Sequence, residues 1–148
     1  MTRIFAKFII PLTLLVAWLV SLNLHVATVD HLNDDQCYQG HQIVWLGLLG
    51  PFALQVSAYA NPVLLLAVVY VVWKWPDVRA ARLILAAVFI ALCVMNAVFW
   101  NRIPDSSGLN FITHRGPGYY LWMATMTSAV AWLLCLWVSV RRRRDRAR

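Results

Sequence analysis

Long apolar stretches without formal charge constrain this chain more than any other feature. Residues 8–29, 83–100 and 119–140 contain no Asp, Glu, Lys or Arg, and each is close to the ~20 residues that a transmembrane helix needs. The chain of 148 residues is also 61% hydrophobic and only 13% charged, whereas a soluble domain carries about 25% charged residues. We therefore predict an all-α integral membrane protein, because a soluble enzyme or nucleic-acid-binding domain needs more surface charge.

The middle of the chain is also uncharged, but it is too long for one crossing. Residues 36–73 carry no formal charge, and as a single helix they would extend about 57 Å, nearly twice a ~30 Å hydrocarbon core. Gly50-Pro51 breaks the apolar run, and Asn61-Pro62 can cap or kink the start of a helix. We predict an interfacial or re-entrant segment over residues 42–56, followed by a spanning helix.

Basic residues indicate how the predicted helices cross the membrane. Cationic loops stay on the cytoplasmic side, and basic residues flank the stretches at Arg3 and Lys7, at residues 74–82 and in the run from Arg141 to Arg148. This distribution predicts one bundle of four transmembrane helices with both termini in the cytoplasm. The predicted helices cover residues 8–28, 57–75, 83–100 and 119–140, and a basic tail covers residues 141–148.

The residues of the predicted outer loops form no recognisable catalytic or metal-binding motif. Asp30, Asp34, Asp35 and Cys37 lie in the first loop, and all four His are on the same side. Such side chains can ligate zinc or copper, but their spacing matches no ligand motif. The spans lack central charged residues and the chain has no Glu, which argues against a proton-driven pump. We predict no catalytic residue, no metal site and no cofactor, and Cys37 is expected to be free or in an intermolecular disulfide.

Two stretches resemble a recurring pattern in small four-helix bacterial inner-membrane proteins. Residues 37–62 combine a Gly-rich segment with the step Tyr59-Ala60-Asn61-Pro62, and residues 116–122 begin the last helix with Gly-Pro-Gly and aromatic residues. The resemblance covers less than a quarter of the chain. It implies a four-helix membrane fold and the inner membrane of a bacterium, and it implies no catalytic activity.

The absence of catalytic and intramembrane charged residues favours a non-enzymatic interaction protein. We expect the chain to lie in the lipid bilayer and to bind a protein partner in or at the outer leaflet, as an accessory subunit of a membrane complex or as an immunity protein against a membrane-active toxin. The alternatives are a small oligomeric channel or facilitator and, with less support, a metal-dependent membrane enzyme. The candidate partner-binding residues, where aromatic side chains and special backbone residues converge, are Trp45, Tyr59, Asn61, Arg115 and Tyr119.

Overall fold

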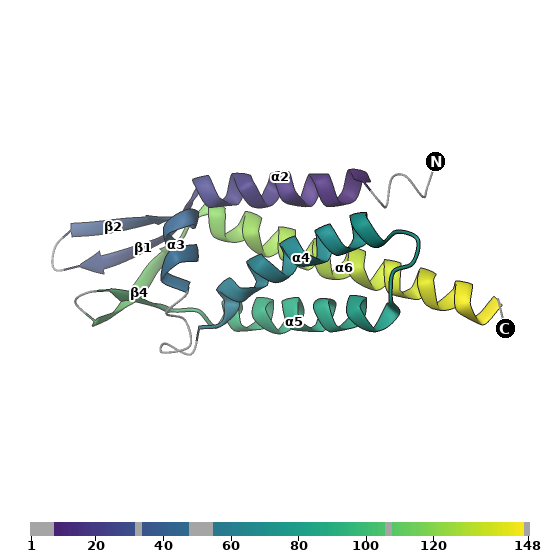
Figure 1. Ribbon diagram of the computed structural model, residues 1–148. Helices are drawn as coiled ribbons and strands as arrows, with labels where there is room; N and C mark the ends of the chain where they lie inside the picture. The colour runs from purple at the N-terminus through teal and green to yellow at the C-terminus, as the bar shows by residue number, and fades with distance from the viewer. Residues whose placement is uncertain (1–7, 32–33, 48–54, 106–107, 147–148) are drawn as a thin grey trace.

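Four helices run side by side along most of the molecule (Figure 1). The computed structural model describes residues 8–31, 34–47, 55–105 and 108–146. The helices are α2 (Ile10–Asn23), α4 (Ala60–Lys74, preceded by the 3-10 turn η3, Ser57–Tyr59), α5 (Ala80–Val98) and α6 (Pro117–Arg146). Within the described residues, three of them are long and apolar enough to cross a membrane: α4 together with η3, α5 and α6.

The helix bounds agree with the sequence for α4 and α5 and differ for the first and last helices. α2 is a helix of 14 residues, whereas the predicted first helix continued to residue 28. The chain leaves the helix at Leu24, which has extended backbone angles (φ −93°, ψ 155°). At the other end of the chain, α6 continues through Arg146, so the described part of the predicted basic tail is helical.

A four-stranded antiparallel sheet was not predicted, and it corrects the expectation of an all-α chain. Its strands are β1 (His25–His31), β2 (Asp34–Gln39), β3 (Arg102–Asp105) and β4 (Gly108–Arg115), in the order β2-β1-β4-β3. The pairing of β1 with β4, for example Ala27 with Arg115 and Val29 with Ile112, joins the two hairpins. β-branched residues such as Val26, Thr28 and Val29 favour strand conformation at this point.

A short helix, α3 (Gly40–Leu46), follows β2 and occupies the start of the predicted interfacial segment. The Gln42 side chain accepts a hydrogen bond from the backbone N–H of Gln39 at 2.8 Å, which completes a capping box at the start of the helix. Residues 48–54 of the predicted segment lie outside the described residues. We call the four strands together with α3 the sheet module.

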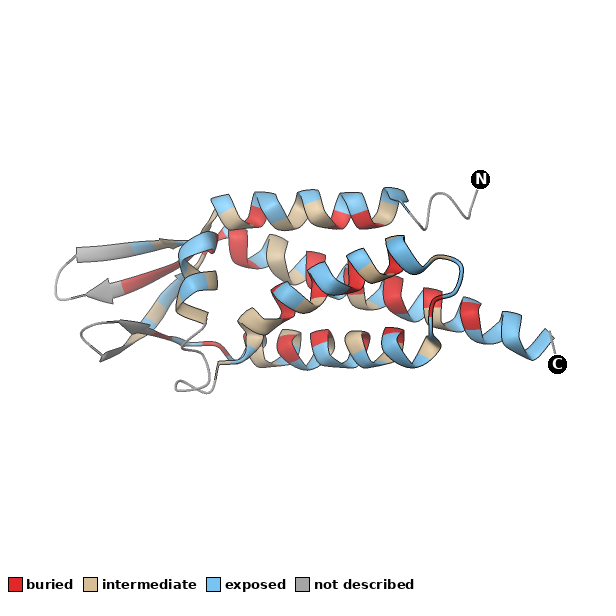
Figure 2. Ribbon diagram, in the orientation of Figure 1, coloured by how far each residue is buried: buried red, intermediate tan, exposed pale blue. Residues whose placement is uncertain are grey.

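The buried side chains form two clusters. The larger lies between the helices, where Leu64, Ile90 and Met126 have no exposed surface. The smaller lies beneath the sheet module and includes Val29 and Ile103. Figure 2 shows the buried positions facing inward along the helices. Many outward positions are large and apolar, which is the pattern of a helix bundle that contacts lipid instead of water.

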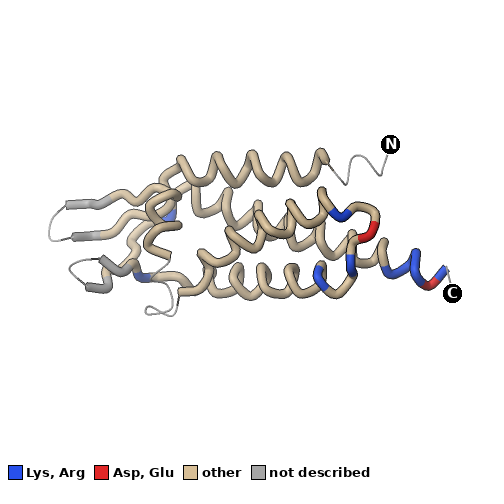
Figure 3. Tube along the Cα trace, in the orientation of Figure 1, with Lys and Arg blue, Asp and Glu red and all other residues tan. Residues whose placement is uncertain are grey.

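The charged residues of the helices gather at the end of the bundle away from the sheet module (Figure 3). We call this the basic end. It comprises Lys74, Arg79 and Arg82 around the α4–α5 turn and the Arg residues between 141 and 146 on α6. At the opposite end, the described basic residues are Arg102 and Arg115 on the sheet module.

Candidate functional site at the sheet module

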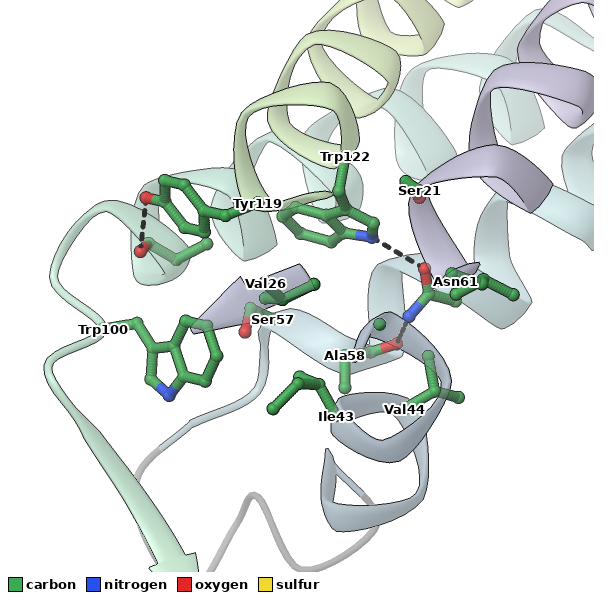
Figure 4. Close-up of a pocket in the computed structure, with 13 residues that line it drawn as sticks. Ser21, Val26, Ile43, Val44, Ser57, Ala58, Asn61, Trp100, Tyr119 and Trp122 are labelled. Carbon is green, nitrogen blue, oxygen red and sulfur yellow. Dashed lines mark hydrogen bonds between the residues drawn. The ribbon is translucent and has the colours of Figure 1, made fainter. Parts of the chain in front are cut away.

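A buried amide joins three helices close to the sheet module. Asn61, in the first turn of α4, is only 4% exposed. Its Oδ1 accepts hydrogen bonds from the indole Nε1 of Trp18 on α2, at 2.9 Å, and of Trp122 on α6, at 2.8 Å. Its Nδ2 donates to the carbonyl oxygen of Ala58 at 2.8 Å, as Figure 4 shows. The sequence suggested that Asn61-Pro62 caps or kinks the start of the helix. The Asn61 amide connects neighbouring helices, and α4 has no side-chain capping hydrogen bond.

The space around Asn61 is a small cavity with mainly apolar walls (Figure 4). Its volume is about 50 Å³, and a buried water requires about 10–15 Å³ on the same measure. Pockets for small-molecule ligands typically occupy about 300–1,000 Å³. The cavity is therefore large enough for a few water molecules, and its geometry is that of a junction between elements.

Arg115 and Tyr119 fasten the end of α5 to the sheet module and to α6. The Arg115 guanidinium donates from Nη2 to the carbonyl oxygens of Val98, at 3.0 Å, and Trp100, at 2.7 Å. The same guanidinium lies 4.8 Å from the centroid of the Tyr119 ring. The Tyr119 hydroxyl donates to the carbonyl oxygen of Ala97 at 3.0 Å. The bonds to Ala97 and Val98 reach carbonyl groups in the last turn of α5, where a helix leaves its carbonyl groups without i+4 partners.

Two glycines of the Gly-Pro-Gly sequence allow β1 to pass directly against the start of α6. The Gly116 N–H donates to the carbonyl oxygen of Val26 at 2.8 Å. A Cβ atom on Gly118 would lie 2.8 Å from the carbonyl oxygen of His25 and 2.9 Å from that of Leu24. Gly40 makes a similar close approach to the backbone at the end of α2. These glycines therefore permit close packing of the backbone where the helices meet the sheet module.

The sheet module carries an open groove of about 410 Å³. It is lined by residues from the end of α5, β4 and the start of α6: Trp100, Asn101, Ile112, Thr113, His114, Arg115 and Tyr120. The Tyr120 side chain is 62% exposed and meets the Tyr119 ring edge-on. Phe111, on β4, is 60% exposed, and its ring lies 4.5 Å from the Arg102 guanidinium.

The five predicted binding residues do not form one surface. Asn61 and Tyr119 line the small cavity, and Arg115 lines the groove. Trp45, on α3, is 72% exposed, and Tyr59, in η3, is half-buried. Tyr120 and His114 were not among the predicted binding residues, although the unusual number of aromatic residues around the start of α6 was a usable signal.

The His and Cys side chains of the described residues do not assemble a metal centre. His25 Nε2 lies 3.0 Å from Thr28 Oγ1, which lies 4.0 Å from Cys37 Sγ. Within the described residues, no group of three or more His, Cys, Asp or Glu side chains is placed to hold a metal ion. The side chains of Asp30, Asp34 and Asp35 lie outside the described residues.

No protein-family model, curated protein or solved structure matches this chain. Function is therefore inferred from the geometry of the sheet module and the helices.

Proposed function

We propose that this chain is a non-enzymatic, multi-pass protein of the bacterial inner membrane that binds a protein partner through its sheet module. The observation that carries the proposal is the groove on the sheet module together with the exposed aromatic rings of Phe111 and Tyr120. Tyr, Trp, Phe and Arg are enriched where protein interfaces become fully buried. Exposed apolar patches rimmed by polar residues mark protein interaction sites.

The membrane arrangement we propose has four crossings. α4, α5 and α6 have the length and composition of spanning helices, and α2 packs against α6. The 14 residues of α2 extend about 21 Å, which is shorter than a ~30 Å hydrocarbon core. Local thinning of the bilayer accommodates a short span at modest cost.

The orientation we propose follows from the separation of charge in Figure 3. Loops rich in Lys and Arg remain in the cytoplasm, so the basic end faces the cytoplasm and both termini lie there. The sheet module, at the opposite end of the bundle, then faces outward. In this position its groove is accessible to a partner in the outer leaflet or beyond it.

The packing between the helices supports binding over conduction through a single chain. Leu64, Ile90, Met126 and Leu133 fill the centre of the bundle with apolar side chains that have no exposed surface. A water-filled path needs polar lining groups and open volume. Among the described residues, the side chains that fill the bundle at this depth are apolar and closely packed, whereas the sheet module presents polar and aromatic groups to the surroundings.

Purification in mild detergent, with mass spectrometry of the retained proteins, tests the proposal. The partner should copurify at constant stoichiometry with the unmodified chain. The double substitution Phe111→Ala/Tyr120→Ala should reduce partner recovery roughly tenfold or more, because interface aromatics commonly contribute over ~1 kcal/mol each. The matched control is Phe89→Ala/Leu92→Ala on the outward face of α5, where both side chains are exposed.

Two outcomes decide the test. Undiminished partner recovery by the Phe111/Tyr120 variant, at normal protein levels, contradicts binding at the sheet module. Equal loss in the α5 control would place the partner against the helices instead. Protection of cells from a membrane-active toxin would identify the partner as a toxin, and stable association within a larger assembly would identify an accessory subunit.

A further inference from the structure

The turn between α4 and α5 forms an open hollow of about 340 Å³ at the basic end. Its walls are formed by Tyr70, Lys74, Asp77, Arg79 and Arg82. Three cationic side chains and one carboxylate give the hollow a formal charge of +2. The net positive charge of this lining favours the binding of an anion.

Aromatic residues contact the three basic residues of this turn. The backbone N–H of Arg79 donates to the Tyr70 hydroxyl oxygen at 2.9 Å, and the Arg82 guanidinium lies 5.1 Å from the centroid of the Tyr70 ring. The Lys74 ammonium lies 5.6 Å from the Trp73 ring. The Tyr70 hydroxyl accepts a bond from Arg79 and still has its own proton to donate. Guanidinium, ammonium and phenol groups are all suitable donors to a phosphate oxygen.

An apolar ridge on α4 leads to the hollow. Leu66, Val69 and Trp73 are 69%, 57% and 78% exposed, and their spacing of three and four residues places them along one side of the helix. A free phosphate ion makes no favourable contact with these apolar side chains, whereas the acyl chains of a lipid can pack against them. Basic pockets between transmembrane helices commonly bind lipid headgroups.

We propose that the hollow lined by Lys74, Arg79 and Arg82 binds the phosphate headgroup of an anionic phospholipid whose acyl chains follow α4. The binding is independent of the protein partner, because the hollow and the sheet module lie at opposite ends of the bundle (Figures 1 and 3).

Native mass spectrometry of the full chain in detergent, titrated with phosphatidylglycerol or phosphatidylcholine, tests this site. The unmodified chain should retain phosphatidylglycerol in preference to phosphatidylcholine. Arg79→Gln/Arg82→Gln should weaken phosphatidylglycerol binding roughly 30-fold, as expected for the loss of two cations beside an anionic lipid. Arg79→Lys/Arg82→Lys retains both charges and should bind within several-fold of the unmodified chain. This second variant separates loss of the site from loss of folding.

The control is Arg142→Gln/Arg144→Gln, which removes two exposed charges from the same end of the bundle but outside the hollow. It should change phosphatidylglycerol binding by less than threefold. An equal loss in this control would show diffuse attraction to the basic end and would overturn the site. Saturable binding of inorganic phosphate without lipid, or no preference between the two lipids, would also overturn it.

Discussion

Replacing Asn61 with Leu is expected to destabilise the helix bundle by about 2–4 kcal/mol. The substitution leaves the indole N–H groups of Trp18 and Trp122 without their acceptor and removes the bond to Ala58. A buried donor left without a partner costs about 1–3 kcal/mol, although single hydrogen bonds measured within membranes contribute nearer 0.6–1.7 kcal/mol. Unfolding of the purified protein in detergent, followed by tryptophan fluorescence, measures the change.

Asn23→Leu is the matched control for Asn61→Leu. Asn23 is exposed, and its amide donates to the Leu19 carbonyl within its own helix, so the substitution should change stability by less than about 0.5 kcal/mol. Trp122→Phe removes the indole N–H. It should lower the stability of the protein less in the Asn61→Leu background than in the unmodified protein, because both substitutions remove the same hydrogen bond. Equal stability of Asn61→Leu and the unmodified protein would mean that the amide does not join the helices.

Gly118→Ala is expected to loosen the sheet module from the helices. The added methyl group would lie within 3 Å of two backbone carbonyl oxygens, at Leu24 and His25, and neither can move without shifting the start of β1. Overpacking of this kind costs about 1–3 kcal/mol. Hydrogen exchange of the β1 and β4 amides should become faster, while exchange in the centres of α5 and α6 should stay close to that of the unmodified chain.

Pro117→Ala provides the control at the neighbouring position. The Pro117 side chain is exposed at the first residue of α6, where Ala is also compatible with a helix. Its exchange pattern should match that of the unmodified protein. If Gly118→Ala left the β1 amides fully protected, the close contact between β1 and α6 would not be needed to hold the sheet module.

The helices of membrane-spanning length could be predicted from sequence because their signal is local. Leu, Val, Ile and Ala fill each stretch, and basic residues follow the stretches that form α4 and α6. The predicted start of α5, at residue 83, differs from the observed start at Ala80 by three residues. The sheet could not be predicted in the same way. Residues 25–29 continue the apolar run of α2, but they form a strand that pairs with residues 36–39 of β2 on one side and with residues 112–115, far along the chain, on the other.

The position of Asn61 was evident from the sequence, but its contacts were not. Trp18 and Trp122 lie 43 and 61 residues away from it, and only the rotation and packing of three helices bring their indoles to one amide. The groove likewise depends on β4 lying beside the end of α5 and the start of α6. Arg115 could be singled out as an unusual charge in an outer loop, whereas its neighbours Tyr120 and His114 gain significance only from the fold.

The proposed function requires the sheet module to face away from the cytoplasm, and Cys37 tests this directly. Cys37 is exposed on β2 and Cys93 is buried, whereas Cys135 is exposed on α6, within a proposed membrane-spanning helix. After mild reduction, a membrane-impermeant maleimide should label Cys37 in intact cells, and Cys37→Ser should abolish that labelling. A cysteine introduced by Asp77→Cys at the basic end, in the Cys37→Ser background, should react only after permeabilisation. Labelling of Asp77→Cys in intact cells, with Cys37 protected until permeabilisation, would contradict the proposed orientation and the placement of the binding surface.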